Sequence, residues 1–173
     1  MNRTRAIVSI LAVAAASGCA MPMTPGQFRS FATSHTTLMK TATFTVDRPF
    51  VNVARTLRVE SGRCLNKRVN LTFMEPGMYG TEVQGTSTDV YHSTWRVLPT
   101  GAELAVQMLQ VDANYVQKIP KRGPYELVAD IRRLGPRKTH VHLYYDRFGA
   151  DLIITTVTGW TTGKNTGYPD LTR

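Results

Sequence analysis

Residues 90–111, VYHSTWRVLPTGAELAVQMLQV, carry the clearest structural pattern of the chain. Apolar and polar residues alternate on both sides of Pro99-Thr100-Gly101, which is the period of a strand with one buried face. The predicted inner faces comprise Tyr91, Trp95 and Val97 in a strand over 90–98, and Leu104, Val106 and Met108 in a strand over 102–111. The short turn between the two strands predicts a β-hairpin.

The same two-residue period occurs on either side of this hairpin. It predicts strands over residues 38–46, 67–74, 125–134 and 139–145, and a weaker strand between Met78 and Thr86. Gly135-Pro136 separates the last two of the four and predicts a second hairpin.

Two other segments have apolar residues at spacings of three and four, which is typical of amphipathic helices. The first begins at Asp47-Arg48-Pro49, where we expect Asp47 near the N-cap and Pro49 in the first turn, and it ends near residues 62–66. The second begins near Phe148 and ends near Gly159 or Gly163. The predicted inner faces are Phe50, Val53, Ala54, Leu57, Ser61, Cys64 and Leu65, and then Phe148, Leu152, Ile153, Thr156, Val157 and Trp160.

These elements predict an α+β fold. We expect an antiparallel sheet of five to six strands with two helices packed on one face, in the order strand-helix-strands-helix. The opposite face of the sheet is expected to be exposed to water. The sequence predicts a single domain over residues 38–163 and a polar tail over 164–173.

The N-terminus has a different composition. Asn2-Arg3-Thr4-Arg5 is positively charged, and residues 6–16 are apolar apart from Ser9, which is the plan of a secretory signal peptide. The apolar stretch is too short to cross a bilayer, which takes ~20 residues. The segment ends in Ala16-Ser17-Gly18-Cys19, which resembles the lipobox of bacterial lipoproteins.

This resemblance implies that residues 1–18 are a signal peptide cleaved between Gly18 and Cys19, and that the Cys19 thiol carries a diacylglyceryl group. Several acyl chains on one residue would make Cys19 a permanent membrane anchor. Ala20 is similar to the residue that follows the cysteine in the outer-membrane class. The alternative is a secreted protein cleaved after Ala14-Ala15-Ala16. Residues 19–37, rich in Pro, Gly, Ser and Thr, predict a flexible tether.

The chain is basic, with a net charge of +9, and cleavage would remove Arg3 and Arg5 but no acidic residue. Such a charge favours anionic envelope surfaces or acidic proteins. Candidate contact residues lie near both ends of the strand over 125–134: Lys118, Lys121, Arg122, Arg132, Arg133, Arg137 and Lys138. A separation of ~33 Å makes two patches, which argues against nucleic acid. The alternative is that they are solvated hairpin tips that protect strand edges.

The sequence contains no catalytic motif and predicts neither an enzyme nor a cofactor. His140 and His142 share one strand face and could meet His92 or Asp130 around a metal. We predict no metal site, since zinc-like ligand spacing is absent and Arg132 would repel a cation. Cys64 is expected to be buried, with an intermolecular disulfide as the alternative.

Together these patterns predict a non-catalytic outer-membrane lipoprotein that faces the periplasm and acts as an interaction or scaffold module of an envelope or secretion assembly. Its expected partners are the membrane, through lipid on Cys19, and an envelope protein. The alternative is a lipoprotein that binds an apolar or anionic small ligand between helices and sheet, around Phe50, Leu57, Trp95 and Trp160.

Overall fold

The computed structural model describes residues 24–35, 37–76, 82–111, 124–147 and 150–164, and the single positions 167, 169 and 171. Cys19 and the predicted contact residues Lys118, Lys121 and Arg122 lie outside the described residues. The helices are α1 (Pro25–Ser34), α2 (Phe50–Cys64) and α3 (Asp151–Thr162). The strands are β1 (Met39–Val46), β2 (Arg68–Pro76), β3 (Glu82–Leu98), β4 (Gly101–Val111), β5 (Tyr125–Gly135) and β6 (Lys138–Asp146).

All six strands form one antiparallel sheet in the order β1-β6-β5-β4-β3-β2. The predicted α+β class is confirmed, and so is the hairpin, in which Leu98 of β3 pairs with Gly101 of β4. The predicted weaker strand between Met78 and Thr86 is present over the described residues 82–86, but it is not separate from the strand that follows, because β3 runs unbroken from Glu82 to Leu98. Val97 was predicted to face inward but is 74% exposed, since it lies at the end of the strand.

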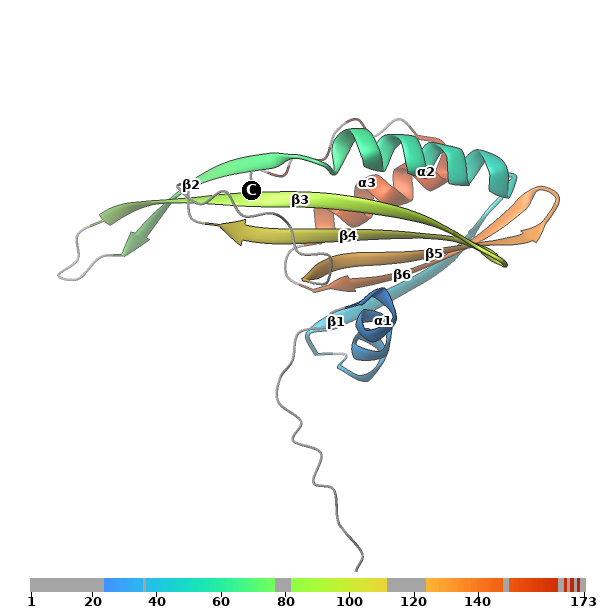
Figure 1. Cartoon of the computed structure of the whole chain (residues 1–173), viewed down its shortest axis with the longest axis horizontal. Coiled ribbons are helices and arrows are strands. Elements are labelled where there is room, and N and C mark those ends of the chain that lie inside the picture. Colours follow the sequence, from blue (N-terminus) through green and yellow to red (C-terminus); the bar gives the residue numbers. More distant parts are fainter. Residues whose placement is uncertain are drawn as a thin grey trace, which may run out of the picture.

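Helices α2 and α3 lie together on one face of the sheet, as predicted (Figure 1). The core between them and the sheet is built from fully buried residues of both layers, among them Val53, Leu57, Leu104, Leu127, Ile131, Val141, Leu143 and Val157. Cys64 is also buried there, as expected. Helix α3 ends at Gly163, whose positive φ of 84° favours glycine.

The N-cap of α2 was predicted wrongly. Pro49 occupies this position with no side-chain cap, so Asp47 does not cap the helix. Arg48 has the structural role instead, because its Nη1 donates to the carbonyl oxygens of Trp160 and Thr161, at 2.9 and 2.8 Å. This pair of bonds fastens the beginning of α2 to the end of α3.

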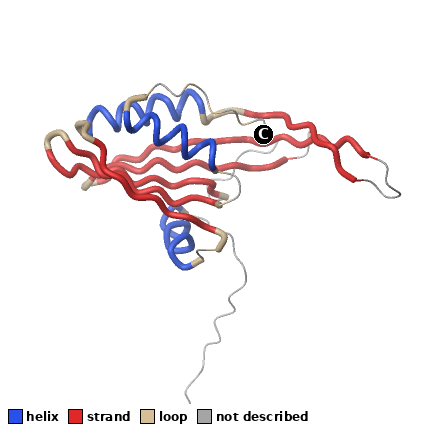
Figure 2. Tube along the Cα trace, turned by 180° about the vertical axis from the view of Figure 1, so that it is seen from behind, coloured by secondary structure: helices blue, strands red, loops and turns tan. Residues whose placement is uncertain are grey.

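The opposite face of the sheet carries α1 (Figures 1 and 2). Thr24 caps this helix, because its hydroxyl oxygen accepts a hydrogen bond from the backbone N–H of Gln27, and Pro25 is in the first turn. Phe28 and Ala32 of α1 pack in a second apolar cluster with Met39, Ala105, Val128 and Tyr144. The predicted flexible tether is therefore wrong over Pro25–Ser34, and the prediction of a wholly exposed face is wrong where α1 covers it.

Strands β2 and β3 extend past the ends of the helices as a two-stranded ribbon (Figures 1 and 2). The ribbon pairs residues 68–76 with residues 82–90, and β2 is an edge of the sheet. Within the described part of the chain, the helices are too short or too polar to span a membrane.

Candidate functional site

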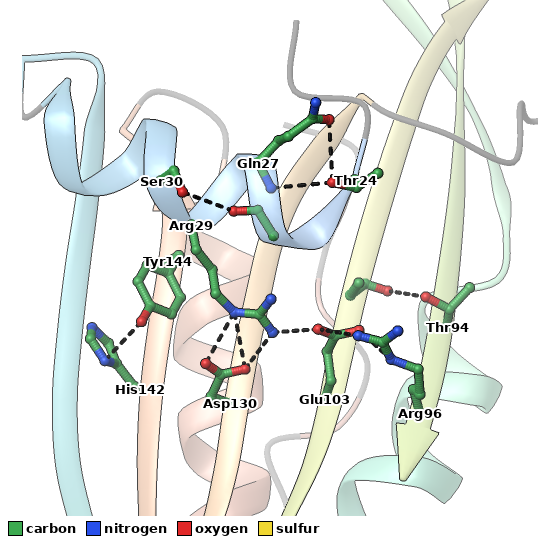
Figure 3. Close-up of polar contacts among 12 residues, drawn as sticks. Thr24, Gln27, Arg29, Ser30, Thr94, Arg96, Glu103, Asp130, His142 and Tyr144 are labelled. Carbon is green, nitrogen blue, oxygen red and sulfur yellow. Dashed lines mark hydrogen bonds and ion pairs between the residues drawn. The ribbon is translucent and has the colours of Figure 1, made fainter. Parts of the chain in front are cut away.

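A row of charged side chains crosses the face of the sheet that α1 partly covers. Arg96 of β3 is paired in register with Glu103 of β4, Glu103 with Asp130 of β5, and Asp130 with His142 of β6. Register partners in adjacent strands project from the same face of a sheet. Local strand alternation therefore brings four chemically active side chains into one line, which Figure 3 shows from the α1 side.

Arg29 of α1 reaches down to this row and bonds two of its carboxylates. Its Nε donates to Asp130 Oδ1 and Oδ2 at 3.2 and 3.0 Å, and its Nη2 donates to Asp130 Oδ1 at 2.5 Å and to Glu103 Oε2. From the other side, Arg96 Nε lies 3.2 Å from Glu103 Oε1. We call Arg29, Glu103 and Asp130 the Arg29 clamp (Figure 3).

The carboxylates of the clamp are buried, with Glu103 only 4% and Asp130 only 8% exposed. Two buried carboxylates require positively charged partners, because removing a carboxylate from water is unfavourable. Burial by itself would lower the pKa of Arg29, but hydrogen bonds and charge from Asp130 and Glu103 outweigh it and raise the pKa. Arg29 therefore remains a cation, and the clamp fixes α1 to the sheet.

His142 and Tyr144 of β6 lie beside the clamp. Their rings stack with centroids 4.2 Å apart, and the Tyr144 hydroxyl is 3.2 Å from His142 Nδ1. Burial lowers the pKa of His142, against the opposing charge of Asp130. Among the residues that the structure describes, His, Cys, Asp and Glu side chains form no group of three that could hold a metal ion.

A pocket of about 260 Å³ opens next to the clamp, at the end of the sheet where β3 turns into β4. Its charged lining residues are Arg29, Arg96, Glu103, Asp130 and Arg132, and the others are Leu98, Thr100, Gly101, Ala102 and Ile131. The Arg96 side chain is 63% exposed and Arg132 is exposed, whereas both carboxylates are buried. Positive groups therefore face the solvent, and the negative groups lie beneath them.

The predicted basic residues at this end of β5 do not form one patch. Arg132 lies in the pocket, whereas Arg133 is on the helix side, with its guanidinium 5.8 Å from the Phe50 ring centroid. Arg137 is in the turn before β6 and Lys138 begins that strand, both exposed. Adjacent residues of a strand project to opposite faces of the sheet, so Arg132 and Arg133 lie on different faces. This alternation is visible in the sequence and could have predicted that the two residues do not share a patch.

The space between helices and sheet is occupied by core side chains. Leu57 is 0% and Trp160 is 2% exposed, and Phe50 and Trp95 pack against the same cluster. The pocket beside the clamp is on the other face of the sheet. This pocket is therefore not at the position between helices and sheet that was considered from the sequence.

A second polar group lies on the helix side of the sheet, towards the ribbon. Ser87 and Asp89 are 8% and 7% exposed, and Ser87 Oγ and Asp89 Oδ1 have no hydrogen-bond partner among the described residues. Glu126 of β5 is close enough to interact with Asp89. Burial raises the pKa of Glu126 to about 7, and the charges of Asp146 and Asp89 add to this effect. Glu126 therefore exchanges its proton near neutral pH.

The sequence matches no protein-family model and no curated protein at a significant level. The class defined by fold and site is thus an α+β protein whose six-stranded sheet carries two helices on one face and a clamped N-terminal helix on the other.

Proposed function

We propose that this chain is a non-catalytic outer-membrane lipoprotein that faces the periplasm and serves as an interaction module of an envelope assembly. The sequence from Met1 to Cys19 supports the anchor, and the position of α1 supports the role of the domain. The observation that carries the proposal is the Arg29 clamp, which fastens to the sheet the helix that follows the proposed lipid site.

The clamp determines how far the domain extends from the membrane. The segment from Cys19 to the start of α1 at Pro25 spans at most ~20 Å when fully extended. A free tether up to Thr37 would reach about three times as far. With α1 docked, the lipid holds the sheet near the bilayer, which suits a module that presents one fixed surface to a partner.

The β2–β3 ribbon is the surface we assign to the protein partner. It extends beyond the helices, and β2 is an edge strand, whose unpaired backbone groups favour addition of another strand. Met74 on this edge strand is 59% exposed, which gives an apolar contact for an incoming chain.

Anchoring is tested by Cys19→Ala in the full chain expressed in a two-membrane bacterium. We expect the unchanged protein to incorporate labelled palmitate and to stay with outer membranes until detergent is added. The variant should carry no label and should be released, because no acyl chain remains to hold it. Cys64→Ala is the control and should keep the label, and an unlabelled, detergent-independent wild-type protein would contradict the proposal.

The partner surface is tested by Met74→Asp with crosslinking in intact envelopes. We expect a discrete crosslinked adduct in the unchanged chain and a several-fold loss of that adduct in the variant, because a charge would be buried at the contact. Val59→Asp on α2 is the matched control, since Val59 is 56% exposed on a different surface. Equal adduct yields from both variants would remove the ribbon as the contact surface.

A further inference from the structure

We propose that the pocket beside the Arg29 clamp binds a phosphate group, carried by a lipid headgroup or free in solution, between the guanidinium groups of Arg96 and Arg132. This inference goes beyond the proposed function, and it does not require the lipid on Cys19. It rests on three properties of the pocket: the buried position of its carboxylates beneath exposed arginines, the absence of an ion pair between Arg132 and any described residue, and its size.

The charges are layered. The Glu103 and Asp130 side chains, 5% and 11% exposed, form the deep layer, and Arg29 is bonded to both of them. Arg96 lies above, with 63% of its side chain exposed. Its Nε and Nη2 lie 3.2 and 3.3 Å from the two carboxylate oxygens of Glu103, so Nη1 is the nitrogen left for an incoming anion. The three arginines outnumber the two carboxylates, so an incoming anion meets a net positive charge.

Arg132 is the third arginine of the pocket, and it lies outside the ion pairs that join Arg29 and Arg96 to the two carboxylates. It is exposed, and it forms no ion pair with any residue in the described ranges. Its register partner on β4 is Gly101, and the partner of Gly101 on β3 is Leu98. A Cβ at Gly101 would collide with the carbonyl oxygen of Ile131, so β4 and β5 approach closely here and their backbones form the floor of the pocket.

Two guanidinium groups around one opening suit a tetrahedral anion. A phosphate group offers several acceptor oxygens, and guanidinium binds them in pairs with charge-assisted hydrogen bonds. Thr100 adds a hydroxyl donor at the rim. The volume of about 260 Å³ is below the roughly 300–1,000 Å³ of clefts for drug-sized ligands, and therefore fits a group no larger than a headgroup.

The test is a calorimetric titration of the full chain in a neutral detergent, with inorganic phosphate in one arm and a short-chain phosphatidic acid in the other. We expect saturable binding that weakens as salt is added. Arg132→Gln should lower the affinity about tenfold, as expected for one lost charge-assisted hydrogen bond. Arg133→Gln is the matched control: it removes the same charge from the adjacent residue on the opposite face, and it should leave the affinity unchanged.

The arms separate the two sources of phosphate. Equal affinity for both probes identifies a free phosphate group as sufficient, whereas much tighter binding of phosphatidic acid identifies a lipid headgroup. Arg132→Lys, which keeps the charge but not the fork, should bind with intermediate affinity and also serves if the Gln variant fails to fold. Absence of saturation in both arms, or equal losses in Arg132→Gln and Arg133→Gln, would overturn the proposal.

Discussion

Replacement of Arg29 by methionine is expected to lower the free energy of unfolding by about 3–5 kcal/mol, the range for removing one partner of a buried ion pair. Methionine preserves most of the apolar stem, so the loss isolates the charge. Asp130 would lose the guanidinium that bonds both its oxygens, while Glu103 would keep Arg96. Urea unfolding followed by circular dichroism measures the change, and hydrogen exchange of the α1 amides should show that this helix loses protection first.

Arg63→Met is the matched control for this prediction. Arg63 is also a helical arginine paired with a carboxylate, Glu60, but its side chain is 55% exposed. A surface pair of this kind contributes only ~0.5 kcal/mol. Arg29→Met combined with Asp130→Asn should recover part of the lost stability, since no charge is then stranded. A loss no larger than that of Arg63→Met would show that the clamp does not hold α1.

The hairpin over residues 90–111 was predictable because everything that determines it is local. Alternation fixes which residues of each strand face the core, and the two-residue turn at Pro99 and Thr100 fixes the register, so that Leu104 and Trp95 pair across the strands. The second hairpin and both helices on the core side follow from similarly short-range patterns. Such patterns were enough to predict the fold class and most of the core residues.

Helix α1 was missed because its apolar residues form no clear stripe, and only Phe28 and Ala32 are buried. Its start nevertheless has a recognisable pattern. Thr24 before Pro25 is a capping residue followed by a first-turn proline, the same kind of pattern that was applied to Asp47 and Pro49. Tertiary contacts with the sheet stabilise this helix, and tertiary contacts are not visible in its own sequence.

The Arg29 clamp could not be predicted from spacing. Arg29 is 101 residues from Asp130 and 74 from Glu103, and the two carboxylates lie on strands whose register had to be known first. Glu103 lies on the sheet face that was expected to be exposed to water, yet it is only 4% exposed because α1 lies over it. The sequence predicted which strand residues share this face of the sheet. It did not predict α1, whose Arg29 completes the site.

The environment of Glu126 depends on an irregularity that has no sequence pattern. The pairing of β4 with β5 shifts between Val106 and Gln107, so that Gln107 pairs with Tyr125 and Glu126 is left over as a bulge residue. In a regular ladder, Glu126 would continue the alternation towards the α1 face. The bulge instead brings it within the influence of Asp89 and Tyr91 of β3.

Glu126→Gln is expected to stabilise the protein by about 3 kcal/mol at pH 8 and to change little at pH 4. Burial raises the pKa of Glu126 from 4.5 to about 7, so the folded state binds a proton that the unfolded state has released. Between those two values, stability therefore falls as pH rises, at 1.36 kcal/mol per pH unit for one group. Above pH 7 the folded protein retains the unfavourable effect of a partly buried charge near Asp89 and Asp146, and glutamine removes it.

Urea midpoints of the two chains from pH 4 to pH 8 measure this difference. The sign is unusual for a carboxyl group, since one held by a cation would contribute stability that is lost on acidification. Burial raises the pKa of Asp89 as well, so the slope should not vanish entirely in the variant. Glu60→Gln is the control, because Glu60 pairs with Arg63 on the surface, and it should shift the midpoints slightly and in the destabilising direction. Parallel curves for Glu126→Gln and the unchanged chain across this range would mean that Glu126 is solvated in the folded protein, and the bulge would then have no electrostatic consequence.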